Sequence, residues 1–456
     1  MSFLEDLAAR RRFGMKPGLE TIRALCSKLG DPQRKFKAIH VAGTNGKGAV
    51  CAILDAALRS ASGQRSAVSG QRIGRYTSPH LVKLNERFFL DGKPVDDVKL
   101  ERMADRVGRA MRDTGDCCAD VADTTFFEAL TAVAFELYAE AKVDYAILEC
   151  GLGGRLDATN VCDPAVCVIT KVGLDHCDWL GDTVEKIAAE KAGIVKPGVP
   201  VVLGRNEPGV IEVIRRRAAE VGAPFHYAPD LADESEIPSD FSLFGSFNRE
   251  NAVTALAALK TLFGNRVQPI AVDGFRKVVW PGRFQRVGNF IVDGAHNPPA
   301  ARALKESLEG LEGLDASMSA KPLDLIFGAC GDKDVGEVLS ILAPVVKKGY
   351  AVRTNNPRSL SAEDTAAKMR AAGIDAVACD SLGEAIRRAG RKTEDGMRGE
   401  RRTLICGSLF LAGEALVELG AYPWGCARFD LSETLRTNGP GGCQKPVAGQ
   451  SKCNYR

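Results

Sequence analysis

The stretch Ile39-His40-Val41-Ala42-Gly43-Thr44-Asn45-Gly46-Lys47-Gly48 decides the fold of this chain. The apolar run over 38–42 is typical of a buried strand, a glycine-rich turn follows it, and residues 49–58 have helical spacing. At such a turn backbone N–H groups point at an anion, and Lys47 adds a positive charge. We therefore predict a phosphate site for a nucleoside triphosphate at Gly43, Thr44, Asn45, Gly46, Lys47 and Gly48.

This turn differs from the common P-loop. In that motif a Ser or Thr that holds Mg²⁺ directly follows the lysine, whereas here Gly48 follows Lys47 and the glycines are closer together. A glycine turn alone would be an ordinary connection before a helix. The lysine at the strand-to-helix turn is what favours phosphate binding.

The composition is that of an ordinary globular protein, with 456 residues, 45% hydrophobic and 26% charged. The length favours two or three domains, and the net charge of +3 argues against a surface that coats nucleic acid. No apolar run approaches the ~20 residues that cross a bilayer, so we expect no membrane association. The 14 cysteines are scattered without a C-x-x-C pair, which indicates buried free thiols in a reducing, cytoplasmic compartment.

Strand-like apolar runs alternate with helical segments, which indicates parallel sheets with crossover helices. A break falls at Trp280-Pro281-Gly282-Arg283. We predict an α/β protein with a large N-terminal P-loop-type domain of mostly parallel sheet over 1–284, a smaller Rossmann-like α/β domain over 288–425 and a disordered tail over 427–456. The expected strands are 38–42, 145–149, 165–170, 199–203, 290–293, 323–327 and 403–406, and two of the expected helices are 127–141 and 183–192.

Four polar residues downstream of the turn are candidates for metal chemistry. Glu149 ends an apolar strand, and His176 follows another, at the edge where ligands of open α/β sheets bind. Ser78 lies in a loop, and Lys191 lies at the end of a predicted helix. Each has an ordinary structural reading when taken singly, as a strand end, a core histidine, a turn serine or a solvated lysine.

Taken together, nine motifs occur in the order of one family. They are GTNGKG, RYTSPHLVKLNER, TFFEALTAVAF, LECGLGGRLDATN, GLDHCDWLGDT, EKAGIVKPG, WPGRFQRV, DGAHNP and CGSLFLAGE. Over roughly residues 10–420 the chain resembles the folylpolyglutamate synthase/dihydrofolate synthase family of the Mur ligase superfamily. The resemblance implies a ligase that uses ATP to convert a substrate carboxylate into an acyl phosphate, which the α-amino group of L-glutamate then attacks.

The resemblance also implies the ligands of the site. Ser78 and Glu149 would hold one Mg²⁺, Glu149 and His176 a second, and Lys191 would be carbamylated by CO₂. Lys47, Lys191 and His176 are the expected catalytic residues. The residues expected to contact ATP besides the turn are Asn251, Arg283 and Asp293, those expected near the incoming glutamate are His296 and Ser408, and those expected against dihydropteroate are Thr125, Phe127 and Asp157.

The expected partners are small molecules, namely dihydropteroate, reduced folates and L-glutamate, and a monomer suffices for them. Three positions depart from the family pattern: Ala49 replaces a usual Ser or Thr, Phe247 a frequent His and Asn248 a frequent Gln. Because of Ala49, an ATP-binding protein without ligase activity stays an alternative. If Phe127 only packs in the core, the alternative is a monofunctional folylpolyglutamate synthase.

Two further readings are weaker. Another Mur-type amide ligase would generally carry an extra N-terminal domain, and only about 38 residues precede the first strand. A dinucleotide-binding oxidoreductase is suggested by Gly151-Leu152-Gly153-Gly154 after a strand, but this string lacks the third spaced glycine.

Overall fold

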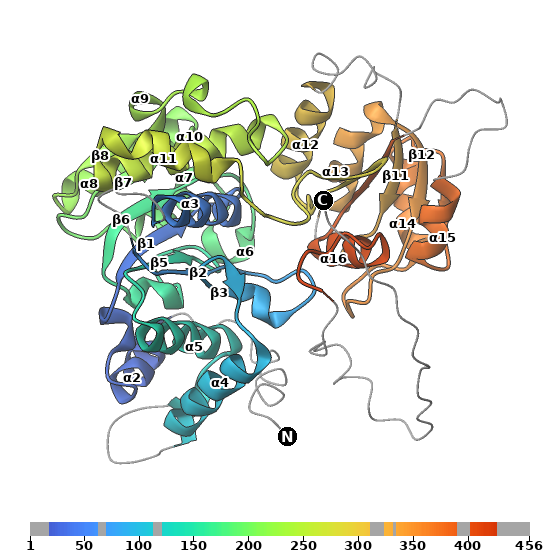
Figure 1. Ribbon diagram of the computed structural model, residues 1–456. Helices are drawn as coiled ribbons and strands as arrows, with labels where there is room; N and C mark the ends of the chain where they lie inside the picture. Colours follow the sequence, from blue (N-terminus) through green and yellow to red (C-terminus); the bar gives the residue numbers. More distant parts are fainter. Residues whose placement is uncertain are drawn as a thin grey trace.

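The computed structural model describes residues 18–62, 70–112, 121–310, 323–331, 334–389 and 402–425, which form two sheet-based parts (Figure 1). The tail predicted over 427–456 lies outside these residues. None of the described helices is both long and apolar enough to cross a bilayer.

The first part is built on an eight-stranded sheet in the order β4–β3–β2–β5–β1–β6–β7–β8. Its strands pair in parallel except at β3 and β4, which are antiparallel. The strands are β1 (Lys37–Ala42), β2 (Ile73–Tyr76), β3 (Phe88–Leu90), β4 (Lys93–Pro94), β5 (Tyr145–Glu149), β6 (Pro164–Ile169), β7 (Val201–Leu203) and β8 (Phe225–Tyr227).

Helices cover both faces of this sheet, which explains why its central strands are continuous apolar runs. Ile39 and Val41 of β1 face the layer that contains α3 (Lys47–Ser62), α10 (Ser246–Phe263) and α11 (Gln268–Phe275). Ala38 and Ala42 face the opposite side. The helices on that side are α2 (Glu20–Lys28), α4 (Asp97–Arg112), α5 (Phe126–Ala141), α7 (Val184–Ala192) and α8 (Pro208–Glu220).

The second part has a six-stranded sheet in the order β13–β12–β11–β14–β10–β9, in which only the β9–β10 pair is antiparallel among the described strands. Its strands are β9 (Gln285–Val287), β10 (Phe290–Val292), β11 (Leu323–Phe327), β12 (Val346–Ala351), β13 (Ala376–Ala378) and β14 (Thr403–Cys406). One face packs against α12 (Pro298–Gly310), α13 (Val335–Leu342) and α14 (Ala362–Ala371), and the other against α15 (Leu382–Ala389) and α16 (Leu409–Glu418).

The predicted fold class is confirmed, with small errors at the ends of elements. The strands predicted at 145–149, 323–327 and 403–406 have these bounds in the structure, and the one predicted at 199–203 begins only at Val201. The strand predicted to reach 293 ends at Val292. The helix expected from residue 49 begins at Lys47, so the lysine itself lies in the first helical turn.

Candidate active site in the cleft between the two sheets

A cleft of about 870 Å³ lies where the two parts of the chain meet. The loop over 43–49, Glu149 and the segment after β6 line it from the first part, and residues around 293–303 and 407–410 line it from the second. The first group lies beyond the carboxyl ends of parallel strands, where open α/β sheets bind their ligands.

The glycine-rich loop is held by the segment that follows β6. The backbone N–H groups of Thr44 and Asn45 donate to the carbonyl oxygen of Lys171 at 2.9 and 3.2 Å, and the Thr44 hydroxyl donates to that of Gly173 at 3.0 Å. The first turn of α3, which begins at Lys47, lines the cleft directly after this loop. The N–H groups of a first helical turn have no partner within the helix, so they are available to an anion.

Trp280 explains why glycine follows the lysine. A Cβ atom at Gly48 would lie 2.3 Å from Cζ2 of the Trp280 indole, so a Ser or Thr there would require the ring to move. The guanidinium of Arg75 lies 5.4 Å from the same ring, and Arg75 is itself buried beside Asp55 at 3.7 Å. The space that a Ser or Thr side chain would need at residue 48 is therefore filled by the Trp280 indole.

Two lysines meet at one backbone carbonyl. Nζ of Lys47 donates to the carbonyl oxygens of Gly43 at 3.1 Å and Thr44 at 3.2 Å, and Nζ of Lys191 donates to that of Gly43 at 2.9 Å. Lys191 is buried, and this burial, followed by the charge of Lys47, lowers its pKa to about 7. A large share of the Lys191 side chain is therefore a neutral amine near neutral pH.

Glu149 is a buried carboxyl group at the end of β5. Its Oε2 accepts a hydrogen bond of 2.9 Å from the backbone N–H of Ser78, which places this loop residue beside it. Burial raises the pKa of Glu149, while Lys47, the Ser78 hydrogen bond and Arg283 oppose the rise. Ser78 and Glu149 both line the cleft, and the oxygen atoms of their side chains are the kind of ligand that Mg²⁺ prefers.

His176 also lines the cleft, with a side chain that is 45% exposed. It adopts a left-handed conformation with φ 51° just before α6 (Cys177–Leu180). Within the described ranges, no three His, Cys, Asp or Glu side chains come together to hold a metal. The predicted ligand set contains only two of these, Glu149 and His176, so a bound Mg²⁺ would need phosphate and water oxygens as well.

Asp293 and Arg283 line the cleft from the second part of the chain, where Asp293 is buried and Arg283 is partly buried. The two oxygens of Asp293 accept from the backbone N–H groups of Phe284 and Ala295, each at 2.7 Å. Burial raises the pKa of Asp293, and Arg283 opposes the rise. Asp293 therefore shapes the turn that holds Arg283 in the cleft.

The other predicted nucleotide and glutamate residues line the same cleft. Asn251 lies against the loop, because a Cβ atom at Gly46 would be 2.3 Å from its Oδ1. His296 is in hydrogen-bond contact with the Gly294 carbonyl at 2.8 Å, and the Ser408 hydroxyl accepts from the N–H of Leu411 at the start of α16. The structure thus gathers residues from distant parts of the sequence in one cavity.

The three residues predicted to contact dihydropteroate lie behind one wall of the cleft. The Phe127 ring packs against Gly151 and lies 6.0 Å from the Tyr76 ring, while Asp157 accepts from the N–H of Leu152 at 2.8 Å. Thr125 caps α5. None of the three is among the residues that line the cleft itself, although Gly151 and Leu152 are.

The positions that depart from the family pattern are accounted for locally. Ala49 is buried in the first turn of α3, and Asn248 is buried with its amide donating to the Phe244 carbonyl at 2.6 Å. Phe247 lines the cleft with its ring edge-on to Phe284 at 6.1 Å. Ala49 and Phe247 thus replace polar groups with apolar ones, whereas Asn248 keeps an amide that bonds within the wall.

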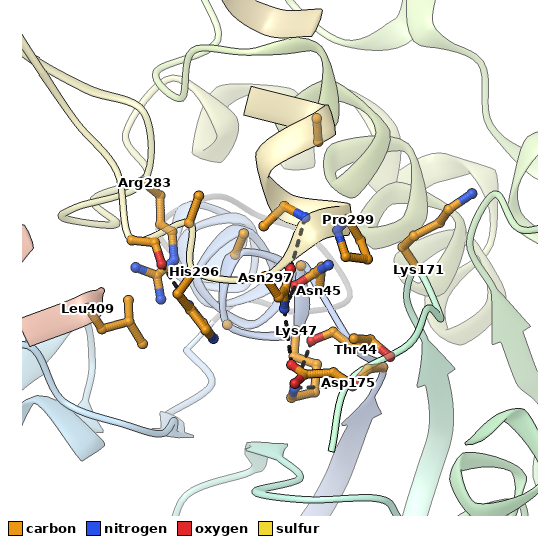
Figure 2. Close-up of a pocket in the computed structure, with 18 of the residues that line it drawn as sticks. Thr44, Asn45, Lys47, Lys171, Asp175, Arg283, His296, Asn297, Pro299 and Leu409 are labelled. Atoms are coloured by element: carbon orange, nitrogen blue, oxygen red, sulfur yellow. Dashed lines mark hydrogen bonds between the residues drawn. The ribbon is translucent and has the colours of Figure 1, made fainter. Parts of the chain in front are cut away.

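Asp175 and Asn297 were missed by the sequence prediction. The Asn297 amide donates to Oδ2 of Asp175 at 3.0 Å and approaches Oδ1 of Asn45 at 3.5 Å (Figure 2). Both lie inside recognised motifs, each next to a histidine that was selected. Their place inside these two motifs is the only sequence signal that could indicate them, because nothing else in the sequence distinguishes them from other polar residues beside a site residue.

Family models and known proteins match the chain along most of its length. The Mur ligase middle domain matches residues 41–221 and the Mur ligase glutamate ligase domain residues 282–409. The dihydrofolate synthase/folylpolyglutamate synthase of Bacillus subtilis is 33% identical over 385 residues, which cover 78% of this chain and 85% of that protein.

Solved structures agree with this similarity. Escherichia coli FolC in complex with DHPP and ADP has a TM-score of 0.76 at 29% identity, and the match covers 92% of this chain and 98% of that one. The bifunctional folylpolyglutamate synthase/dihydrofolate synthase of Yersinia pestis, complexed with AMPPNP and a Mn ion, has a TM-score of 0.76 at 28% identity with the same coverage.

Proposed function

The chain belongs to the dihydrofolate synthase/folylpolyglutamate synthase family of the Mur ligase superfamily, and from this we infer that its cleft joins L-glutamate to folate precursors with ATP. It is an ATP-dependent glutamate ligase with two acceptors, dihydropteroate and reduced folates. The observation that carries this function is the convergence of the Lys47 loop, Glu149 and the DGAHNP segment on one cleft between the two matched domains.

The reaction has two steps. A carboxylate oxygen of the acceptor attacks the γ-phosphorus of ATP, which gives an acyl phosphate and releases ADP. The neutral α-amino group of L-glutamate then attacks the acyl carbon, the bond to the phosphate oxygen breaks, and the nitrogen loses a proton, which leaves an amide and inorganic phosphate. Phosphoryl transfer of this kind depends on positioning and on neutralising charge on the phosphate oxygens.

We assign the phosphates of ATP to the Lys47 loop. The N–H groups of the first α3 turn and the Lys47 ammonium face the same cleft, and the loop is already fixed by its bonds to Lys171 and Gly173. Asn251, Arg283 and Asp293 would complete the nucleotide site. A fixed loop supports this role because preorganised donors need no rearrangement when charge develops.

Ser78, Glu149 and His176 are proposed to hold divalent metal, and the solved structure of the Yersinia pestis relative contains a Mn ion. The hard oxygen donors of Ser78 and Glu149 fit Mg²⁺, and phosphate oxygens of the nucleotide would supply further ligands of the same kind. When bound, the metal would neutralise charge on the transferring phosphoryl group.

Lys191 is proposed to react with CO₂ to form a carbamate. The neutral amine attacks the carbon of CO₂ and loses a proton, so the reaction requires the deprotonated form. The lowered pKa of about 7 supports this proposal because it supplies neutral amine under physiological conditions. The product is an anion where the amine otherwise lies close to the Lys47 charge.

His296 and Ser408 are proposed to receive the incoming glutamate, and Thr125, Phe127 and Asp157 to receive dihydropteroate. The contacts of Phe127 with Gly151 and of Asp157 with Leu152 support the second assignment, since they join both residues to the wall of the cleft. We also propose that the enzyme is monomeric and cytoplasmic; the free cysteines of the described chain, buried except for Cys177, accord with a reducing compartment.

The test is ADP release by the purified protein with Mg-ATP and L-glutamate, with dihydropteroate, tetrahydrofolate or no acceptor. We expect turnover with either acceptor and none without. Turnover with tetrahydrofolate alone would limit the activity to chain extension, and silence with both would overturn the ligase. Glu149→Ala is the matched negative control, which we expect to abolish turnover with both acceptors.

A further inference from the structure

We propose that Glu86 and Tyr422 form a clasp by which the C-terminal part of the chain positions the loop that presents Ser78 to the cleft. We call residues 78–83 the serine loop. The proposal rests on the proposed function in one respect, namely that Ser78 contributes to the metal site. Neither Glu86 nor Tyr422 lines the cleft, so both are positioning residues.

The side chain of Glu86 binds the backbone of the serine loop at the loop's C-terminal end. It is buried in the short helix η3 (Leu84–Arg87), where its Oε2 accepts from the N–H of Leu81 at 2.7 Å. Its Oε1 accepts from the N–H groups of Val82 at 2.8 Å and Lys83 at 2.7 Å. Three consecutive amides bound to one carboxyl group fix the path of the chain here.

The fourth donor to Glu86 comes from the other end of the protein. The Tyr422 hydroxyl donates to Oε1 of Glu86 at 2.6 Å, although 336 residues separate the two. Two further contacts join the segment after α16 to the first part of the chain. The Trp424 ring packs edge-on to Phe89 of β3 at 5.3 Å, and Nζ of Lys83 donates to the Gly425 carbonyl.

Helix α16 touches the same loop from a second direction. A Cβ atom at Gly413 would lie 2.6 Å from the carbonyl oxygen of Leu81, so the helix backbone and the loop backbone are in direct contact. The Leu81 side chain packs into the apolar cluster between α16 and the second sheet. Leu81 is thus held by Glu86 at its N–H and by α16 at its carbonyl side.

These contacts bear on the metal site through a short connection. Ser78 is bonded to Glu149 through its backbone N–H, and Leu81 is only three residues further on. The serine loop is therefore tied at one end to the first sheet and at the other to the C-terminal part. When Tyr422 is bonded to Glu86, the clasp restricts the movement of Ser78.

The experiment compares Tyr422→Phe with the wild type in the full chain. The variant removes one oxygen atom and keeps the ring that packs on Trp424 at 5.7 Å. We expect faster amide hydrogen exchange at 81–83, and a rise of roughly tenfold in the Mg²⁺ concentration for half-maximal ADP release, the size of one hydrogen bond to a charged acceptor. Tyr227→Phe in edge strand β8 is the control, and we expect it to leave both quantities unchanged.

Two further variants keep the test decisive. In a Glu86→Gln background, Tyr422→Phe is expected to add much less than in the wild type, because both act on one bond. Gly413→Ala displaces the same loop by another route and should also speed exchange at 81–83, which covers the case in which Tyr422→Phe does not fold.

The proposal and the ligase function can fail separately. Unchanged exchange at 81–83 in Tyr422→Phe would overturn the clasp whether or not the protein turns over ATP. An unchanged Mg²⁺ requirement with faster exchange would equally overturn it, since the loop would then not act on the metal site. If the wild type released no ADP with any acceptor, the ligase function would be overturned. The exchange rates at 81–83 would still test the clasp.

Discussion

The side-chain amide of Asn297 donates a 3.0 Å hydrogen bond to Oδ2 of Asp175, and so joins the start of α12 to the loop that carries His176. The same Asn297 accepts from the N–H of Ala300 at 2.9 Å and thereby caps α12. One side chain thus contributes to a helix in the second part of the chain and to the position of a loop in the first (Figure 2).

Asn297→Asp separates these two roles. An aspartate keeps the oxygen that caps the helix, but it replaces the amide donor with a carboxyl group that faces Asp175. We expect kcat/KM for ATP to fall roughly 10- to 100-fold, from the lost hydrogen bond and the like charge, with little change in the unfolding temperature. Asn265→Asp, in the exposed segment after α10, is the control. Equal kinetics for Asn297→Asp and the wild type would show that the link has no part in catalysis.

Lys47→Met tests the phosphate site. The methionine keeps an unbranched side chain that is one atom shorter, and it removes the charge that the loop carbonyls hold in place. We expect kcat to fall about 100- to 1000-fold, the usual loss for one preorganised group that stabilises transferring charge. Steady-state ADP release measures it, with Lys347→Met in the exposed part of β12 as the control. Near-normal turnover in Lys47→Met would be incompatible with the assigned role.

How much the sequence predicts depends on whether a residue's surroundings are local. The apolar runs of β1, β5 and β14 were found because strands buried on both faces are hydrophobic throughout. β2 was not predicted, since its four residues include Arg75, whose burial depends on Asp55 and on the Phe89 ring 3.8 Å away. A charged residue reads as exposed until its distant partners are known.

The site follows the same rule. The Lys47 loop is one contiguous string, so the sequence alone predicts its place at the turn between β1 and α3. The Asn297–Asp175 bond spans 122 residues, and neither residue has a local pattern that indicates the other. Motif order supplied the candidates, but only the packing of the two sheets shows which polar side chains meet.

The lowered pKa of Lys191 predicts how the proposed carbamylation would depend on pH. At fixed dissolved CO₂ the neutral amine increases as pH rises through about 7, so carbamate should increase over the same interval. Carbon-13 NMR of the protein under labelled CO₂ measures it, and Lys191→Ala should lose the signal. Short added carboxylates should partly restore turnover to Lys191→Ala, whereas a failure across a series of them would argue against a catalytic carbamate.

Phe127→Leu tests the proposed dihydropteroate site. Leucine keeps an apolar contact with Gly151 but removes the flat ring available for stacking. We expect the KM for dihydropteroate to rise about three- to tenfold while the KM for tetrahydrofolate stays the same. Phe263→Leu, where the ring packs edge-on to Tyr145 at 5.6 Å, is the matched control. An equal rise for both acceptors would assign Phe127 to packing alone.

His40 makes the stability of the first part depend on pH. It is fully buried in β1, with Nε2 in hydrogen-bond contact with the Thr159 hydroxyl at 2.8 Å, and burial lowers its pKa from 6.5 to about 3. Between these values the unfolded chain binds a proton that the folded chain does not, so this group favours unfolding increasingly as pH falls from 6.5.

A difference of one bound proton between the unfolded and folded chain changes the free energy of unfolding by at most about 1.4 kcal/mol per pH unit. His40→Gln removes the titrating group and keeps a polar side chain near Thr159, so its unfolding temperature should fall less steeply between pH 6.5 and 4.5 than that of the wild type. His226→Gln in β8 is the control, and comparing slopes separates this linkage from any constant loss of stability that the substitution causes. Parallel slopes for His40→Gln and the wild type would mean that the folded protein accepts the proton at His40 as readily as the unfolded chain does.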